Sequence, residues 1–411
     1  MQDISTLKSL IEQQIKQPPD KVSVIKLVDL FVEYAYATHA SDIHIEPAID
    51  ELRVRYRIDG LLYDVFGEKQ IRQELHPEVI SRVKVLSGLR TDEHLLPQDG
   101  RMKVRMEDLG DVDVRVSIIP TFYGENAILR VLAQTQNLGM ENLGFSAKDL
   151  EKVKRAITKP YGMVLANGPT GSGKTTTLYT FLKQLNKSDV SIITIEDPIE
   201  YSLDGTTQIQ TNADIGLTFA NGLRSILRQD PNIIMVGEIR DEETASIAVN
   251  AALTGHLVFS TLHTNDAATT FPRLLDMGVP PFLVASTVNV AVGQRLIRML
   301  CQKCKEERVL SEEESKSLRE ILPEFTPGTM KFYKAGACPE CAGTGYESRI
   351  AIREVLEMND EIRRLVMGRA SAQDIKAAAI RGGMTTMIED ALVKVAAGLT
   401  TIEEVIRVVH E

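Results

Sequence analysis

The stretch Gly168-Pro169-Thr170-Gly171-Ser172-Gly173-Lys174-Thr175 decides the fold of this chain. It fits the pattern G-x-x-x-x-G-K-[ST], in which glycines let several backbone N–H groups point at one phosphate while the following helix adds the positive end of its dipole. The apolar residues 163–166 predict a buried strand before it, and residues 176–179 begin a helix after it. This context favours a phosphate-binding loop (P-loop) over a chance glycine-rich turn, so we expect a nucleoside triphosphate to bind here.

The P-loop also predicts which side chains contact the nucleotide and its metal. Lys174 is placed to reach the β- and γ-phosphates, and the Thr175 hydroxyl is placed to ligate Mg²⁺. The predicted nucleotide-binding residues are Gly168, Pro169, Thr170, Gly171, Ser172, Gly173, Lys174, Thr175 and Thr176.

Length and composition are those of an ordinary globular protein. The 411 residues, 43% hydrophobic and 25% charged, suggest two or three domains. The net charge of −10 disfavours a protein that coats nucleic acid, because such domains usually carry a basic excess. No apolar run approaches the ~18 residues of a membrane-spanning helix, and the N-terminus lacks the pattern of a signal peptide. We therefore expect a cytoplasmic protein that reaches a membrane only through a partner.

The first part of the chain changes from helical to strand-like periodicity. Residues 1–20 predict a short leader, helical or loose, after which apolar residues first recur at helical spacing and then alternate with arginine. The predicted helices are 22–39 and 77–89, and the predicted strands are 52–58, 102–106, 112–119 and 127–132. This pattern indicates an α+β domain with a largely antiparallel sheet over residues 1–135.

Four segments follow this domain. Residues 136–146, which carry Gly and Asn, predict an interdomain linker. Residues 147–300 predict a mostly parallel α/β core, with strands at 163–166, 192–195, 233–236 and 257–261. Residues 301–345 form a cysteine-bracketed insert. Residues 346–411 are predicted to be helical, with helices at 361–367, 372–380, 387–396 and 402–410.

Acidic residues follow two of the predicted core strands. Glu196 follows the strand 192–195, and Glu238 follows the strand 233–236. In the second strand, Gly237-Glu238 stands where many P-loop enzymes carry Asp-Glu. Glu238 must therefore take the acidic role at that strand end, and two carboxylates at neighbouring strand ends allow one to act on water and the other on the metal shell. The alternative is that these acids cap helices or pair with arginine.

One histidine and several arginines complete the candidates for the reaction. His263 follows the apolar strand 257–261, where an imidazole can hydrogen-bond the γ-phosphate. Arginine suits a developing phosphate charge, and a neighbouring subunit can supply it. Spacing alone does not choose among the candidates Arg101, Arg115, Arg130, Arg224 and Arg228.

The four cysteines form two C-x-x-C pairs, Cys301/Cys304 and Cys338/Cys341. Four thiolates in two such turns match a closed tetrahedral Zn²⁺ site, whose binding energy would hold the insert folded. Redox chemistry is the alternative, but a thioredoxin-like motif needs a single C-x-x-C at a helix N-terminus. The zinc is therefore predicted to be structural.

Several longer stretches follow one another in a characteristic order. They are 40–47 (ASDIHIEP), 55–60 (RYRIDG), 97–101 (PQDGR), 194–201 (TIEDPIEY), 222–231 (GLRSILRQDP), 255–265 (GHLVFSTLHTN) and 294–296 (QRL). Together they resemble the type II secretion and type IV pilus assembly ATPase family, in which 194–201 corresponds to the Asp box and 255–265 to the His box. The resemblance runs from about Val24 to the C-terminus.

The resemblance implies a homo-hexameric ring motor that hydrolyses ATP. Each subunit would join a PAS-like N-terminal sheet domain to a RecA-like domain, and turnover would rotate one domain on the other. Glu196 resembles the general base that orients the attacking water, and Glu238 resembles the Walker B acid near Mg²⁺. Arg115 and Arg130 fall where the family places charge-neutralising arginines of the N-terminal domain. The pair Arg224 and Arg228 matches arginines of the nucleotide domain.

The family also implies a place of action and leaves alternatives. It implies assembly of a pilus or a secretion pseudopilus at the cytoplasmic face of the inner membrane, with a membrane-platform protein and no stable nucleic-acid partner. The cysteine insert favours extension or secretion over retraction, because retraction motors of this family typically lack it. A retraction or type IV secretion ATPase is the alternative, and a nucleic-acid translocase is a third reading that the acidic net charge disfavours.

The sequence departs from the family pattern in three respects. Leu95 stands where the family usually shows a basic residue, and Asn126 stands where Lys is common. Many members also carry additional N-terminal domains, whereas this chain starts almost directly at the sheet domain. We expect either a shortened chain or a naturally short member.

Overall fold

The computed structural model describes residues 3–66, 71–106, 110–132, 139–321 and 331–410, which divide into two compact units. The first unit holds Met1–Gln136, Arg298–Glu306 and Lys334–Ser348, and the second holds Asn137–Ile297, Glu307–Tyr333 and Arg349–Glu411. Residues 136–138 of the predicted linker lie outside the described residues, and its remainder contains a short 3-10 helix, Met140–Leu143. The five domain limits taken from the sequence stay predictions.

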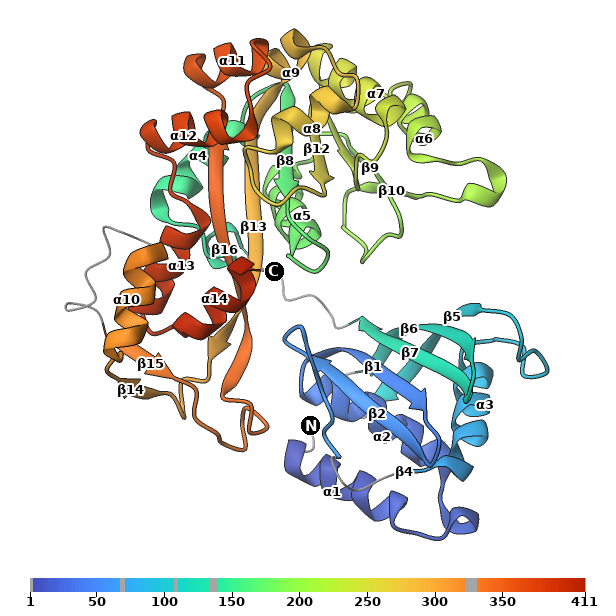
Figure 1. Ribbon diagram of the computed structural model, residues 1–411. Coiled ribbons are helices and arrows are strands. Elements are labelled where there is room, and N and C mark those ends of the chain that lie inside the picture. Colours follow the sequence, from blue (N-terminus) through green and yellow to red (C-terminus); the bar gives the residue numbers. More distant parts are fainter. Residues whose placement is uncertain (1–2, 67–70, 107–109, 133–138, 322–330, 411) are drawn as a thin grey trace. The chain divides into compact units, whose positions relative to one another are not determined.

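The first unit is built on an antiparallel sheet. Its strand order is β3-β2-β1-β7-β6-β5, and β4 also pairs with β2. The elements are α1 (Ile4–Ile15), α2 (Val24–Ala37), β1 (Ala40–Pro47), β2 (Glu51–Ile58), β3 (Leu61–Tyr63), β4 (Ile71–Arg72), α3 (His76–Leu86), β5 (Gln98–Met106), β6 (Gly110–Thr121) and β7 (Gly124–Leu132). Helices α2 and α3 pack against one face of this sheet (Figure 1). The predicted antiparallel α+β character is confirmed.

Strand β2 explains why the sequence revealed this sheet. Leu52, Val54 and Tyr56 are at most 2% exposed, whereas the arginines between them point to the opposite face. Side chains of a strand alternate between the two faces, so one face packs on the helices and the other remains polar. Strands β1, β3 and β4 were not predicted, whereas α1 is the helical form of the leader expected over residues 1–20.

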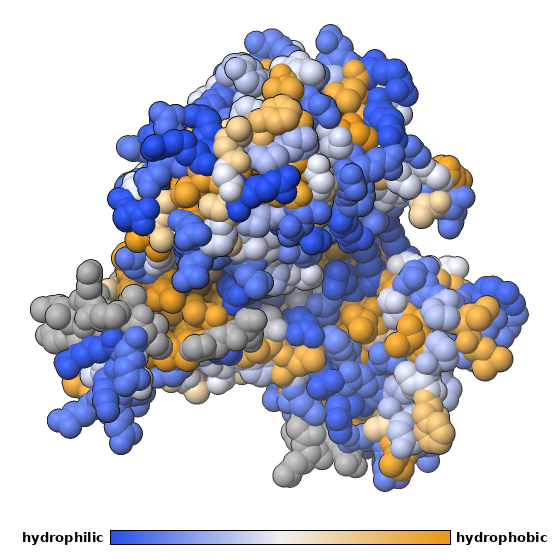
Figure 2. All heavy atoms as spheres, turned by 45° about the horizontal axis from the view of Figure 1, so that its top comes forward, coloured by the Kyte–Doolittle hydropathy of each residue, from blue (hydrophilic) through white to orange (hydrophobic). Residues whose placement is uncertain are grey.

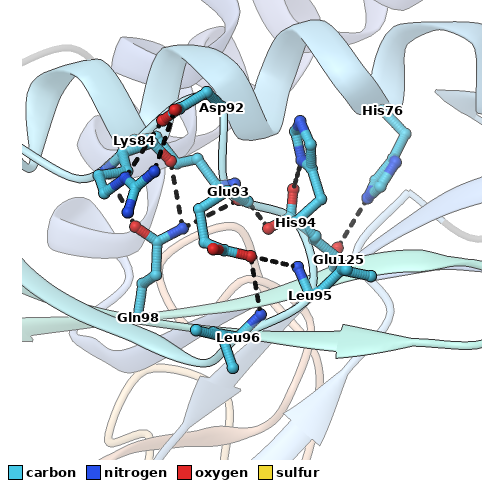
Figure 3. Close-up of polar contacts among 10 residues, drawn as sticks. His76, Lys84, Asp92, Glu93, His94, Leu95, Leu96, Gln98 and Glu125 are labelled. Atoms are coloured by element: carbon cyan, nitrogen blue, oxygen red, sulfur yellow. Dashed lines mark hydrogen bonds and ion pairs between the residues drawn. The ribbon is translucent and has the colours of Figure 1, made fainter.

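A buried ion pair anchors the loop between α3 and β5 (Figure 3). Lys84 Nζ lies 2.6 Å from Glu125 Oε1 in an almost fully buried environment. The Oε2 atom of Glu125 lies 2.8 Å from His94 Nδ1, and the backbone carbonyl oxygen of Glu125 lies 2.7 Å from His76 Nε2. These contacts hold the loop against β7, and Leu95, the residue that departs from the family pattern, is 83% exposed.

The second unit contains a sheet with the strand order β10-β9-β11-β12-β8-β13-β16. The pairs from β10 through β13 are parallel, which confirms the predicted α/β class. The strands are β8 (Gly162–Asn167), β9 (Ile192–Glu196), β10 (Thr207–Gln210), β11 (Ile233–Val236), β12 (Leu257–Leu262), β13 (Val288–Leu300) and β16 (Tyr346–Glu357). The four strands predicted for this core are present to within one residue at each end.

Helices cover both faces of this sheet and create two apolar cores (Figure 1). One core packs α4 and α5 on β8, and the other packs α6 to α9, α11 and α12 on the opposite face. The helices are α4 (Ala147–Ile157), α5 (Lys174–Leu185), α6 (Phe219–Ile226), α7 (Glu242–Leu253), α8 (Thr270–Asp276), α9 (Pro281–Thr287), α11 (Asp360–Met367) and α12 (Ala372–Arg381). A parallel sheet requires this cover because its strands are buried on both faces.

A third apolar cluster joins the C-terminal helices to the ends of β13 and β16. It contains α10 (Glu312–Ile321), α13 (Met387–Ala396) and α14 (Ile402–His410), near the short ribbon β14 (Glu306–Arg308) and β15 (Phe332–Lys334). The last four predicted helices are present. The start of the predicted C-terminal helical region 346–411 is not helical, because Tyr346–Glu357 forms the strand β16.

The sequence analysis missed β13 and β16 because both strands contain polar residues that are buried. Gln294 and Glu354 are at most 1% exposed and Arg353 is 3% exposed. Such residues look like breaks in an apolar run, and only partners distant in sequence satisfy them.

In the view of Figure 2 hydrophilic side chains cover much of the surface, with hydrophobic residues in groups between them. Within the described residues, no helix combines the length and apolar character needed to cross a bilayer.

Candidate active site

The P-loop connects β8 to α5 and takes its shape from its glycines. Gly168 has φ +143°, and a Cβ there would lie 2.3 Å from the Gln294 carbonyl oxygen, so no larger residue fits. Gly173 has φ +83° and immediately precedes Lys174, the first residue of α5. The loop thus leads into the N-terminus of a helix, the place where such loops bind phosphate.

Lys174 closes the P-loop on itself. Its Nζ donates hydrogen bonds to the carbonyl oxygens of Gly168 at 2.8 Å and of Pro169 at 2.9 Å. Burial lowers the pKa of Lys174, and the charge of Glu238 opposes this shift. These two bonds leave one of the three N–H donors of the Lys174 ammonium available for a phosphate oxygen. Thr175 and Thr176 are half-buried in the first turn of α5.

Glu238 follows β11 and contacts an arginine and a histidine. Its carboxylate forms an ion pair with Arg240, and its Oε2 lies 3.1 Å from His263 Nε2. Strand β12 fixes the backbone beside it, because Thr261 Oγ1 donates to the Gly237 carbonyl oxygen at 2.8 Å and its own carbonyl accepts from Ile239 N at 3.0 Å. The predicted residues Lys174, Glu238 and His263 are therefore neighbours.

Gly237 explains why this strand lacks the usual Asp. A Cβ at position 237 would lie 3.3 Å from the Glu196 Cα and 3.3 Å from the Ile195 carbonyl oxygen, and that carbonyl accepts a hydrogen bond from Gly237 N at 2.8 Å. A side chain would press on the neighbouring strand β9. The acidic role predicted at this strand end consequently falls on Glu238.

Glu196 ends β9 in a sealed environment. The residue is 2% exposed, and its carboxylate accepts hydrogen bonds from Tyr179 Oη, from Thr194 Oγ1 at 2.5 Å and from Gln208 Nε2 at 3.2 Å. Burial raises the pKa of Tyr179, and Glu196 raises it further, so this phenol remains a hydrogen-bond donor. The carboxylate is positioned entirely by neutral donors.

The predicted arginines lie in two separate groups. In the second unit, Arg224 on α6 pairs with Glu243 of α7, and Arg228 donates to the Arg224 carbonyl oxygen at 3.0 Å. Neither of these contacts involves a residue of the P-loop. In the first unit, Arg115 lies between Arg101 and Arg130 in the strand register, and Arg130 Nε donates to Asp42 Oδ1 at 2.9 Å.

The sequence analysis missed residues that contact the predicted acids and the P-loop. Tyr179 and Gln208 hold Glu196, Arg240 pairs with Glu238, and Gln294 donates to the Ser172 carbonyl oxygen at 2.7 Å. Only Arg240 carried a local signal, because it stands two residues after Glu238. His256, at the start of the His box, lies at the opposite end of β12 from His263, and its Nδ1 is 3.0 Å from the Ala251 carbonyl oxygen.

The four cysteines come together in the first unit. Their Sγ atoms all lie within 4.8 Å of one another, with distances of 3.7 Å for Cys301–Cys338, 3.8 Å for Cys304–Cys341 and 3.6 Å for Cys338–Cys341. A tetrahedron with metal–sulfur bonds of about 2.3 Å has edges of about 3.8 Å, so the four thiols fit one Zn²⁺. None of the four forms a disulfide.

Comparisons with known proteins agree with this geometry. A protein family described as Type II/IV secretion system protein matches residues 17–407. The chain is 46% identical over 407 residues to the type IV pilus assembly ATPase PilB of Myxococcus xanthus, covering 98% of this chain and 71% of that one. It is 48% identical over 412 residues to the type II secretion system protein E of Xanthomonas campestris pv. campestris, covering 100% and 70%.

A solved structure shares the architecture. It is the pilus retraction motor PilT with bound ADP, with a TM-score of 0.62 and 25% identity over 92% of this chain and 96% of that chain. The family resemblance inferred from the motifs is thus confirmed.

Proposed function

The chain belongs to the type II/IV secretion system protein family, and from this premise we propose that it hydrolyses ATP to drive assembly of a type IV pilus or a type II secretion pseudopilus. The observation that carries the proposal is the P-loop between β8 and α5 with Glu238 and His263 beside Lys174. The relatives at 46% and 48% identity are named for pilus assembly and for type II secretion. The enzyme class is therefore an ATPase.

The side chains divide the work of phosphoryl transfer to water. Lys174 and the backbone N–H groups of the P-loop bind the β- and γ-phosphates. The Thr175 hydroxyl and Glu238 would hold Mg²⁺, which would supply charge neutralisation at the phosphates. Glu196 accepts a proton from the attacking water, and Tyr179 orients this carboxylate. His263 would hydrogen-bond the γ-phosphate, and its Nε2 lies 3.1 Å from Glu238 Oε2, so it would connect the phosphate to that acid.

Arginines complete the neutralisation of charge. Arg115 and Arg130 stand beside each other on β6 and β7 and are the proposed contribution of the N-terminal domain. Arg224 and Arg228 lie on the surface of the second unit, where a residue serves an adjacent subunit more readily than its own P-loop. This assignment requires a ring, so we propose a homo-hexamer.

The proposed place of action is the cytoplasmic face of the inner membrane. A membrane-platform protein of the pilus or secretion machine would hold the ring there. The names of the two curated relatives support this location, because both belong to machines for pilus assembly or secretion.

The cysteine cluster is proposed to hold a structural Zn²⁺. Cys301, Cys304, Cys338 and Cys341 supply four ligands, which leaves no open position for catalysis. The cluster also favours assembly over the alternative of retraction or type IV secretion on the same core. A nucleic-acid translocase remains disfavoured by the net charge of −10.

Native mass spectrometry of the full chain with Mg²⁺ and a non-hydrolysable ATP analogue tests this proposal. A six-subunit species with one zinc per chain is expected. A chain that binds no nucleotide would overturn the ATPase assignment, and a nucleotide-bound monomer would overturn the ring as a property of this chain alone.

ATPase assays with and without single-stranded DNA separate the third function from the first. The expected rate is the same in both assays. A clear stimulation by the DNA would replace the proposed motor with a translocase.

A further inference from the structure

A buried arginine lies behind the P-loop. Arg353 of β16 is 3% exposed, and each part of its guanidinium has a hydrogen-bond acceptor. Nη1 donates to the Leu143 carbonyl oxygen, Nη2 lies 3.3 Å from Thr177 Oγ1, and Nε lies 3.4 Å from Gln294 Oε1. A planar guanidinium makes several bonds in fixed directions, so it joins three elements that are distant in sequence.

Two of these contacts lead directly to the nucleotide loop. Gln294 Nε2 donates to the Ser172 carbonyl oxygen at 2.7 Å, and its Oε1 accepts from Thr177 Oγ1 at 2.9 Å. Ser172 belongs to the P-loop, and Thr177 lies in the first turn of α5. Arg353 therefore supports the P-loop backbone through one intervening side chain.

The third contact leads to the segment where the chain enters the second unit. Leu143 ends the 3-10 helix Met140–Leu143, and the Phe145 ring lies 4.2 Å from the Arg353 guanidinium carbon. Gly144, with φ +81°, sits so close to β16 that a Cβ would lie 3.0 Å from the Ile350 side chain. Residues 143–145 are thus held against β16 by a carbonyl, a ring and a glycine.

The charge of Arg353 is matched from the other side of the strand. Its backbone N donates to Asp390 Oδ2 of α13 at 2.8 Å, and Lys394 Nζ pairs with the same carboxylate. Burial lowers the pKa of Arg353, and Asp390 opposes this shift. A buried polar network of this kind is stable only when every member is satisfied, so a change at one end alters the others.

The P-loop is where such a change would begin. Lys174 bonds to the carbonyls of Gly168 and Pro169. A phosphate that draws Lys174 away from these carbonyls would act on the backbone between Gly168 and Ser172, and Gln294 is bonded to the last carbonyl of this stretch. Coupling between distant groups requires an element with two states, and the proposal assigns that role to this loop.

We propose that Arg353 is a positioning residue that couples the P-loop to residues 143–145, so that a bound nucleotide changes how firmly the chain is held where it enters the second unit. The inference rests on the proposed nucleotide site. It assigns no contact between Arg353 and the reacting atoms, because Gln294 and Thr177 stand between them.

Hydrogen–deuterium exchange of the full chain, with and without Mg²⁺ and AMP-PNP, tests this coupling. In the wild type we expect AMP-PNP to change the exchange rate of the peptide covering residues 140–146 on the order of tenfold, a typical size for coupled sites. In Arg353→Met that response is lost, whereas the P-loop peptide remains protected by AMP-PNP. Arg349→Met on the same strand is the matched control, because Arg349 is exposed and should leave both responses intact.

The outcomes separate this inference from the function on which it rests. A wild type whose P-loop peptide ignores AMP-PNP contradicts the nucleotide site itself. A P-loop that responds while residues 140–146 respond equally in wild type and Arg353→Met overturns the coupling alone. If Arg353→Met does not fold, Phe145→Leu removes the stacked ring but retains the guanidinium. A full nucleotide response of residues 140–146 in that variant overturns the proposal.

Discussion

The ends of β9 and β11 carry the two predicted catalytic acids in different surroundings. Glu196 is sealed among neutral donors, with Tyr179, Thr194 and Gln208 as its partners. Glu238 instead forms an ion pair with Arg240, contacts the His263 ring, and lies close enough to Lys174 to oppose the lowering of the pKa of that lysine by burial. The two carboxylates on adjacent strands therefore differ in their hydrogen-bond and charge partners, which come from the elements around them.

One edge of the sheet can therefore support two roles, one for each acid. Neutral donors fix the direction of the Glu196 carboxylate without neutralising its charge, which suits a group that orients a water. Glu238 lies beside charged groups next to the P-loop. This position suits an acid that would act near the metal and the phosphates. The strand end places the acid, and its neighbours decide what it does.

Lys174→Ala is expected to have the largest effect, because it removes the cation that lies near Glu238 and is proposed to bind the phosphates. We expect ATP turnover to fall on the order of 10³-fold, as when a charge-stabilising donor is lost. Phosphate release at saturating Mg·ATP measures it. Lys183→Ala, at an exposed position of the same helix, is the control. Wild-type rates in Lys174→Ala would refute the P-loop assignment.

Glu196→Gln and Glu238→Gln test whether both acids act. Each variant should retain ATP binding and lose turnover on the order of 10²-fold, because one loses the base and the other part of the metal shell. Single-turnover hydrolysis and retention of bound ATP on a filter measure these effects. If both variants hydrolyse ATP like the wild type, the assignment of the acids is wrong.

Tyr179→Phe sharpens the comparison on the Glu196 side. It removes one hydrogen bond to the buried carboxylate, and we expect about 1 kcal/mol of lost stability and a severalfold lower kcat. Thermal unfolding and steady-state kinetics measure both. Tyr161→Phe, at a residue that is 52% exposed, is the control. Equal behaviour of the two variants would show that Tyr179 does not position Glu196.

Removal of zinc should have a smaller effect on the site of Glu196 and Glu238 than any of these substitutions. Chelation is expected to loosen the region around Cys301 to Cys341 and to leave nucleotide binding in place, because the cysteines and the P-loop belong to different units. Limited proteolysis and binding of a fluorescent ATP analogue follow the two effects. An unchanged protease sensitivity would contradict a structural metal, and Cys301→Ser should reproduce the effect of chelation.

Local patterns in the sequence predicted much of this fold. The strands β8, β9, β11 and β12 were found because short apolar runs precede Gly168, Asp197, Gly237 and His263. The antiparallel sheet was found from the alternation in β2. The two cysteine pairs predicted their own cluster, because the C-x-x-C spacing encodes a metal knuckle.

The surroundings of the acids could not be predicted in the same way. Tyr179 and Gln208 reach Glu196 from α5 and β10, and nothing in the spacing of these residues marks the contact. Gln294 and Arg353 interrupt the apolar runs of β13 and β16, and only the fold shows that their partners are the P-loop and Leu143. Buried polar residues are satisfied by long-range contacts, which a local pattern does not contain.

The Mg²⁺ dependence of ATP turnover in Glu196→Gln and Glu238→Gln tests the division of roles most directly. The account predicts that Glu238→Gln raises the Mg²⁺ concentration needed for half-maximal activity, while Glu196→Gln lowers kcat and leaves that concentration at the wild-type value. An equal shift in both variants, or a shift in Glu196→Gln alone, would contradict it.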